Sequence, residues 1–160
     1  MLTHGEWRGM GTTIVALLAV GDRVVIGHVG DSRAYLLRDG KLHRLTSDHS
    51  WVNEQVKLGL MTDDEAHHHP MRNIVTRALG NRVDLKVDLT QEDVRAGDLF
   101  LLCSDGLNSM MSDQEILATL EATESDPEKV CHALVDRANQ KGGEDNITVV
   151  VVQIEAKQDN

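Results

Sequence analysis

Four strand-like stretches follow one another early in the chain, joined by connections too short to contain a helix. The dipeptides Gly21-Asp22 and Asp39-Gly40 are typical of tight hairpin turns, and each separates two apolar stretches. A parallel pair of strands needs a crossover of about a dozen residues or more, for which there is no room here. We therefore expect an antiparallel sheet that contains residues 12–20, 23–29, 34–37 and 42–45.

Helix signals dominate the remainder of the chain. Capping boxes begin at Thr62 and Ser112, and Asp126-Pro127 places proline at the favoured first position of a last helix. Apolar residues at helical spacing predict that the two late helices cover one face of the sheet. The other strands are expected at 85–89, 98–103 and 146–154. This order of elements indicates an α+β fold and not a βαβ alternation.

Composition narrows the classes of function. The 160 residues fit one domain, and the charge sum of 16 − 26 = −10 argues against a nucleic-acid surface. The sequence has no stretch of 18 apolar residues that would span a membrane, so we expect no membrane partner. Cys103 and Cys131 both lie in apolar runs, which favours buried free thiols over a disulfide and suits the reducing cytoplasm, where we expect this protein.

Two acidic signatures stand where a predicted strand meets a loop. Asp105 follows the apolar run 99–102, and Asp145 precedes the β-branched run 147–152. Carboxylates held at rigid strand ends suit a hard divalent cation, whereas aspartates in turns commonly accept hydrogen bonds from their own backbone. The residues alone leave both interpretations open.

Seven stretches, in the same order along about 140 residues, resemble the type-2C protein phosphatases, the metal-dependent PPM family of serine/threonine phosphatases, in its bacterial form. They are Met10-Gly11-Thr12-Thr13, Val29-Gly30-Asp31-Ser32-Arg33-Ala34-Tyr35, Leu45-Thr46-Ser47-Asp48-His49-Ser50, His69-Pro70 with Arg72-Asn73, Thr76-Arg77-Ala78-Leu79-Gly80, Cys103-Ser104-Asp105-Gly106-Leu107 and Gly143-Glu144-Asp145-Asn146-Ile147-Thr148.

The resemblance implies a fold, a reaction and a set of ligands. The fold is a four-layer αββα sandwich of two antiparallel sheets flanked by helices. The reaction is hydrolysis of phosphoserine and phosphothreonine in phosphoproteins by a water that two Mn²⁺ or Mg²⁺ ions activate. Asp105 and Asp145 match catalytic metal ligands, Asp31 and Asp105 match ligands of a third metal, and Gly106 and Asn146 are expected to shape the ligand loops.

One part of the family pattern has no counterpart in this sequence. The family begins with an acidic Asn-Glu-Asp element and an Asp-Gly-Met-Gly-Gly-His element, and Gly9-Met10-Gly11 matches neither. We therefore expect an N-terminally truncated domain over 1–156, with a helical insert at 45–79 and a disordered tail at 157–160. Such a chain should bind metal weakly and be nearly inactive alone, and it should pair as a homodimer through exposed strand edges. The alternative is a non-catalytic regulatory or protein-binding domain on the same scaffold.

Several other residue types invite a functional interpretation that we do not favour. His67, His68 and His69 cannot all converge on one ion from a helix end. We expect His67 and His68 at surface positions, whereas His69, which precedes Pro70, fits the insert of the family that the sequence resembles. Arg33 and Arg77 are expected to form structural ion pairs or to clamp backbone carbonyls, in preference to binding phosphate. Trp7 and Trp51 are expected to be packing residues, and Cys103 is not expected to be a nucleophile.

Overall fold

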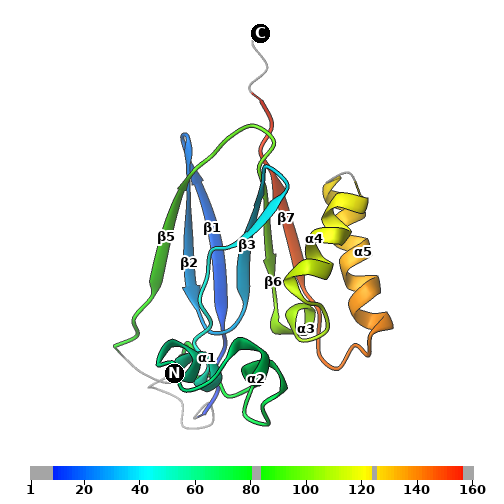
Figure 1. Cartoon of the computed structure of the whole chain (residues 1–160). Helices are drawn as coiled ribbons and strands as arrows, with labels where there is room; N and C mark the ends of the chain where they lie inside the picture. The colour runs from blue at the N-terminus through cyan, green and yellow to red at the C-terminus, as the bar shows by residue number, and fades with distance from the viewer. Residues whose placement is uncertain (1–8, 81–83, 124–125, 157–160) are drawn as a thin grey trace.

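The computed structural model describes residues 9–80, 84–123 and 126–156. Two expectations, the packing of Trp7 and the disordered tail at 157–160, lie outside the described residues. Within the described part the chain builds two antiparallel sheets, a pair of helices on one of them, and two short helices at one end (Figure 1).

The first sheet has three strands in the order β1-β2-β5, which are β1 (Ile14–Val20), β2 (Arg23–Val29) and β5 (Asp88–Asp93). β2 pairs antiparallel with both neighbours, and Ile26 lies opposite Leu17 on one side and Thr90 on the other. β5 begins at Asp88, so the expected strand at 85–89 was placed too early. Its sequence, Asp-Leu-Thr-Gln-Glu-Asp, is mostly polar and contains one β-branched residue. Such a sequence gives little strand signal until its pairing with β2 is known.

The second sheet has four strands in the order β4-β3-β6-β7. They are β3 (Arg33–Arg38), β4 (Lys41–Arg44), β6 (Leu99–Cys103) and β7 (Val149–Gln153). All three pairings are antiparallel, so the expected strand direction is confirmed. The two early hairpins nevertheless belong to different sheets, because the break at Gly30-Asp31-Ser32 carries the chain from one sheet to the other. The closing strand is shorter than the predicted 146–154.

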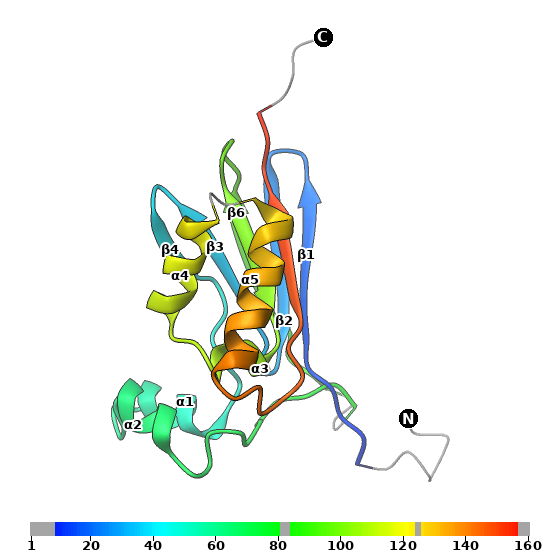
Figure 2. The ribbon, with the colours of Figure 1, turned by 90° about the vertical axis from the view of Figure 1, so that its right-hand side faces the viewer.

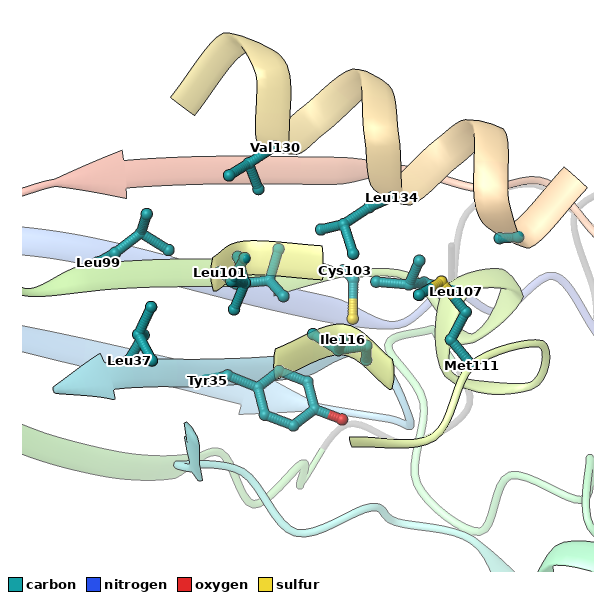
Figure 3. Packing of buried hydrophobic residues seen from close by; sticks show 12 residues of the cluster. Tyr35, Leu37, Leu99, Leu101, Cys103, Leu107, Met111, Ile116, Val130 and Leu134 are labelled. Carbon is teal, nitrogen blue, oxygen red and sulfur yellow. The ribbon is translucent and has the colours of Figure 1, made fainter. Parts of the chain in front are cut away.

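Apolar side chains alternate between two cores because the strand period is two. On one face of the second sheet, Leu36, Phe100 and Leu102 pack against Val24 and Ile26 of the first sheet. On its other face, side chains of β3 and β6 pack under α4 (Asp113–Ala122) and α5 (Pro127–Gln140) (Figures 2 and 3). The buried residues that Figure 3 labels are Tyr35, Leu37, Leu99, Leu101, Cys103, Leu107, Met111, Ile116, Val130 and Leu134.

The expected α+β antiparallel sandwich is therefore confirmed, as is the placement of the two late helices over one sheet face. In the described residues that face is the outer face of the four-stranded sheet, and the outer face of the three-stranded sheet carries no helix (Figure 2). The predicted caps of both helices are present: Ser112 forms a capping box, and the Asp126 side chain accepts from two backbone N–H groups.

Two short helices, α1 (Trp51–Lys57) and α2 (Asp63–His68), lie together at one end of the sandwich (Figure 1). Ser50 and Thr62 cap them, and Gly59 follows α1 with a φ of 70°. An isolated bridge between Ser50 and Val75 closes the base of this segment. A further one-turn helix, α3 (Asp105–Asn108), which the sequence patterns did not predict, begins at the predicted ligand Asp105.

Candidate metal centre

The pairing of β3 with β6 brings two of the predicted ligands to the same end of the four-stranded sheet. Arg33 lies opposite Cys103 in the antiparallel register. Asp31 stands two residues before Arg33, and Asp105 stands two residues after Cys103, so both carboxylates emerge at this end. The structure thus brings together two residues that are 74 positions apart in sequence (105 − 31).

The third predicted ligand, Asp145, is held beside Asp105 by hydrogen bonds between their loops. The Ser104 hydroxyl donates to the Asn146 carbonyl at 3.0 Å and accepts from the Thr148 N–H at 3.0 Å. The Ser104 N–H donates to the Thr148 carbonyl, also at 3.0 Å. Asp145 accepts from the Asn146 N–H at 2.7 Å through one carboxylate oxygen, as the turn interpretation predicts.

Gly106 allows these two loops to approach closely. A Cβ atom at this position would lie 2.4 Å from the Asn146 carbonyl oxygen and 3.3 Å from that of Asp145. Any other residue would push the Asp145 loop away from Asp105. The expectation that Gly106 and Asn146 shape the ligand loops agrees with this geometry.

The three carboxylates form an electrostatically costly arrangement in the absence of a cation. Burial, followed by the negative charge of Asp145, raises the pKa of Asp105. Burial, followed by the charge of Asp105, raises the pKa of Asp31. Asp105 therefore stands between two like charges, a pattern that a bound cation would relieve.

These donors fit a hard divalent cation that retains water. Mg²⁺ is commonly bound through one or two carboxylates plus several waters, and hard oxygen ligands also suit Mn²⁺. Across the residues that the structure describes, no group of three or more His, Cys, Asp or Glu side chains is arranged to hold one metal ion. The described aspartates therefore interact in pairs, Asp31 with Asp105 and Asp105 with Asp145, and do not by themselves form a three-residue metal site.

A cavity of about 120 Å³ opens in front of Asp31 and Asp105. The sheet end and its loops supply one wall of it, and residues of α1 and α2 supply the opposite wall, among them Val52, Asn53 and Ala66. The cavity therefore lies between the proposed ligands and the helical segment.

Asp48 also lines this cavity, and the sequence patterns gave it no role. Its carboxylate accepts from Arg33 at 2.7–3.1 Å, and both side chains are largely buried. The Tyr35 hydroxyl accepts from Arg33 at 3.2 Å and donates to Asp113 at the start of α4 at 2.9 Å. Arg33 is thus a structural ion pair, as expected. The sequence signal that could have pointed to Asp48 is its position within 45–50, one of the seven stretches that resemble the phosphatase family.

Other polar residues occupy structural positions. Arg77 donates to Asp88 at 2.8 Å, which confirms the second expected ion pair. His67 and His68 are exposed, in line with the expected surface positions, and the ring of His69 lies 5.1 Å from that of Trp51. Burial raises the pKa of the Cys103 thiol to about 12, which agrees with the expectation that it is not a nucleophile.

Comparison with known proteins identifies the family. Residues 3–144 match the family model of protein phosphatase 2C. The chain is 45% identical over 149 residues to the serine/threonine protein phosphatase PstP of Mycobacterium tuberculosis, an alignment that covers 93% of the chain and 28% of PstP. It is 42% identical to the serine/threonine phosphatase stp of Listeria monocytogenes, covering 92% of the chain and 58% of stp. The chain belongs to the protein phosphatase 2C family.

Solved structures agree with this assignment. The crystal structure of the Mycobacterium tuberculosis serine/threonine phosphatase PstP/Ppp superposes with a TM-score of 0.86 at 45% identity, over 92% of the chain and 62% of that structure. A PstP catalytic domain in complex with two manganese ions gives 0.83 at 42% identity, covering 92% and 60%. Stp1 of Staphylococcus aureus gives 0.90 at 37% identity, covering 97% and 61%. The chain thus spans about three fifths of these structures.

A membrane span is not found among the helices of the described residues, since none has the length and apolar character needed to cross a bilayer.

Proposed function

We propose that this chain is part of the catalytic domain of a metal-dependent phosphatase that hydrolyses phosphoserine and phosphothreonine in proteins. The observation that carries the proposal is the convergence of Asp31, Asp105 and Asp145 at one end of a protein phosphatase 2C sandwich. In this proposal residues 1–156 belong to the catalytic domain, and 45–79 is a helical insert beside the site.

Asp105 is the central ligand in this proposal. It would share one cation with Asp145 and another with Asp31, because its carboxylate interacts with the charges of both. We expect Mn²⁺ or Mg²⁺, two in the complete domain and a third through the Asp31 pair. The ions, when bound, would lower the pKa of water and offset the charge of the phosphate.

The residues that line the cavity would leave room for a phosphorylated segment of a protein beside Asp31 and Asp105. The Arg33–Asp48 pair keeps the Asp48 charge compensated, so among the three aspartates that line the cavity at the sheet end, Asp31 and Asp105 are those whose charge a cation would offset. Residues of α1 and α2 wall the cavity on the side opposite these ligands, and a phosphoserine or phosphothreonine would enter between the two walls.

The proposal extends to partners and compartment. We place the protein in the cytoplasm, where its two free cysteines would remain reduced. We further propose a homodimer formed through the helix-free face of the three-stranded sheet, on which Leu18 and Leu89 are exposed.

Release of phosphate from a phosphothreonine peptide by the complete gene product, with and without Mn²⁺, tests the proposed activity. We expect Mn²⁺-dependent turnover that falls about 100-fold or more in Asp105→Asn and Asp145→Asn. Asp93→Asn is the matched control, because Asp93 is an exposed carboxylate on β5 that pairs with Arg23 away from the cavity. The 160-residue chain alone should release little phosphate, since its described carboxylates form incomplete ligand sets.

Absence of Mn²⁺-dependent release by the complete gene product would exclude the enzymatic proposal. The scaffold would then be a non-catalytic regulatory or protein-binding domain.

A further inference from the structure

His49 lies buried beside the loop that carries Asp31. Its side chain is 3% exposed. The Nδ1 atom accepts a hydrogen bond from the Gly30 N–H at 3.0 Å, and the His49 N–H donates to the Gly30 carbonyl at 2.8 Å. One residue therefore satisfies both backbone groups of the position immediately before Asp31.

The opposite side of His49 contacts the end of the helical segment and the start of β5. Its Nε2 lies 3.0 Å from an Asp88 carboxylate oxygen and 2.9 Å from the Arg77 Nη1, and the other Asp88 oxygen accepts from Arg77 at 2.8 Å. The His49 carbonyl accepts from the Thr76 N–H at 2.8 Å. His49 thus joins the two ends of the helical segment to the Gly30 backbone.

The hydrogen bonds define the tautomer of the ring. Because Nδ1 accepts from a backbone N–H, the neutral ring carries its proton on Nε2 and donates it to Asp88. His28 stacks on this ring with the centroids 4.7 Å apart, and it is itself buried with no hydrogen-bond partner for either ring nitrogen in the described structure. The stacking and the two hydrogen bonds together fix the orientation of the His49 ring.

The Gly30 loop has little freedom to adopt another position. Gly30 has a φ of 116°, and a Cβ atom there would lie 2.3 Å from the Thr13 Cγ2. Two residues later, the Ser32 hydroxyl lies 2.9 Å from that of Thr13. Asp31 lies between these two anchored positions. Because the packing leaves no free space at Gly30, a displacement of Gly30 would also displace the Asp31 backbone.

We propose that His49 is a positioning residue that couples the seating of the helical segment 45–79 to the placement of Asp31. Asp88 orients the His49 ring, the ring holds the Gly30 N–H, and Gly30 sets the backbone from which the Asp31 carboxylate extends. This inference rests on the proposed function, because Asp31 is taken as a metal ligand.

Two substitutions separate the two sides of the ring. In His49→Asn the side-chain oxygen can occupy the position of Nδ1 and accept from Gly30, whereas His49→Gln reaches the position of Nε2 and leaves the Gly30 N–H without its acceptor. In the complete gene product we expect His49→Gln to raise the Mn²⁺ concentration for half-maximal activity about tenfold, and His49→Asn, which keeps the Gly30 bond but loses the Asp88 contact, to raise it only about threefold. A purely structural role would affect both variants in proportion to their loss of stability.

A second pair of variants tests the contact between Asp88 and His49 without changing the buried His49 side chain. Asp88→Asn and Asp93→Asn each remove one carboxylate from β5 that pairs with an arginine. Only the first contacts His49, so only Asp88→Asn should raise the Mn²⁺ requirement, by about threefold or more. This pair decides the matter if His49→Gln does not fold.

Hydrogen exchange of the backbone in the same proteins provides a readout that needs no activity. We expect the fastest exchange at residues 30–33 in His49→Gln, a smaller increase in Asp88→Asn and His49→Asn, and wild-type exchange there in Asp93→Asn. Equal behaviour of His49→Asn and His49→Gln, in both exchange and Mn²⁺ requirement, would overturn the inference. If the wild type shows no Mn²⁺-dependent activity, the proposed function fails, and the exchange pattern alone then decides whether His49 holds the Asp31 loop.

Discussion

Two aspartates, Asp31 and Asp105, are partly buried next to other negative charges, an unfavourable arrangement that a bound cation would relieve. Asp105 is half-buried, and its pKa is raised first by burial and then by the charge of Asp145. A raised carboxyl pKa stabilises the fold only at low pH, and this contribution is lost as the pH rises through the folded-state pKa. At neutral pH the metal-free chain therefore retains Asp105 at the expense of stability.

Asp105→Asn should consequently stabilise the metal-free chain. In EDTA at about pH 7 we expect the free energy of unfolding to rise by about 0.5–1 kcal/mol, a modest gain because water still screens a half-buried carboxylate. Urea unfolding measures it, and the gain should shrink as the pH falls into the range in which the Asp105 carboxylate becomes protonated. A variant less stable than the wild type at neutral pH would contradict this prediction, with Asp93→Asn as the control.

His28 is predicted to make the fold acid-sensitive. Burial, followed by the neighbouring His49, lowers its pKa from the ordinary value of 6.5. The unfolded chain then binds the proton more readily than the folded chain, so stability is lost as the pH falls below about 6.5.

Urea unfolding at about pH 7.5 and pH 5.5 tests this, with His28→Phe as a ring that cannot titrate. The loss of stability between the two pH values should be smaller in His28→Phe than in the wild type. His132→Phe, at an exposed position of α5, should retain the wild-type loss. An unchanged loss in His28→Phe would show that another group carries the acid sensitivity.

At the scale of elements, the molecule contains one well-anchored part and one weakly anchored part. Every residue of β6 is buried, and α5 buries Val130, Leu134 and Ala138 against the same core. The helices α1 and α2 each bury a single residue, Val52 and Ala66. The helical segment therefore depends on its caps and on the contacts of His49 and Arg77 at its base.

We predict that the segment 45–79 exchanges its amide hydrogens faster than β6 and β7. Local opening costs little free energy where few apolar side chains are buried, so exchange there should exceed that of β7 by about tenfold or more. Hydrogen–deuterium exchange with peptide resolution measures the difference. Equal protection of the segment and β7 would mean that polar contacts alone hold this segment as firmly as the core.

For the whole molecule, the outer face of the three-stranded sheet is a conspicuous apolar surface. Leu18 is 63% exposed and Leu89 is 70% exposed, and Ile14 and Val20 are also exposed on β1. Among the described strands, β1 lies at one edge of this sheet and β5 at the other. Both features favour association, because a second sheet can cover an apolar face and can form hydrogen bonds with the open edge of a strand.

We therefore predict that the chain self-associates at micromolar concentration, through a two-fold contact of this face. Sedimentation should show a species heavier than the 17.7 kDa monomer. Leu18→Lys should shift the population toward the monomer, since it places a charge in the contact. Leu58→Lys is the matched control, because Leu58 is 69% exposed on the helical segment away from β1. A well-folded wild-type monomer would disprove the prediction.

The sequence by itself determined the local structure of this protein. The hairpin turns, the capping boxes at Thr62 and Ser112, and the proline-initiated last helix depend on interactions between residues a few positions apart. Those signals were sufficient for the α+β class and for strand direction. The acidic signatures at Asp105 and Asp145 were visible because each adjoins a strongly apolar or β-branched run.

Only the tertiary structure decided how these pieces meet. The two early hairpins belong to different sheets, and β5 forms from residues that have almost no strand signal. Asp31 lies beside Asp105 because β3 pairs with β6. The tertiary structure also placed His49 between Gly30 and Asp88. These outcomes depend on pairings between residues far apart in the chain, where registry and packing, and not local preference, determine which side chains become neighbours.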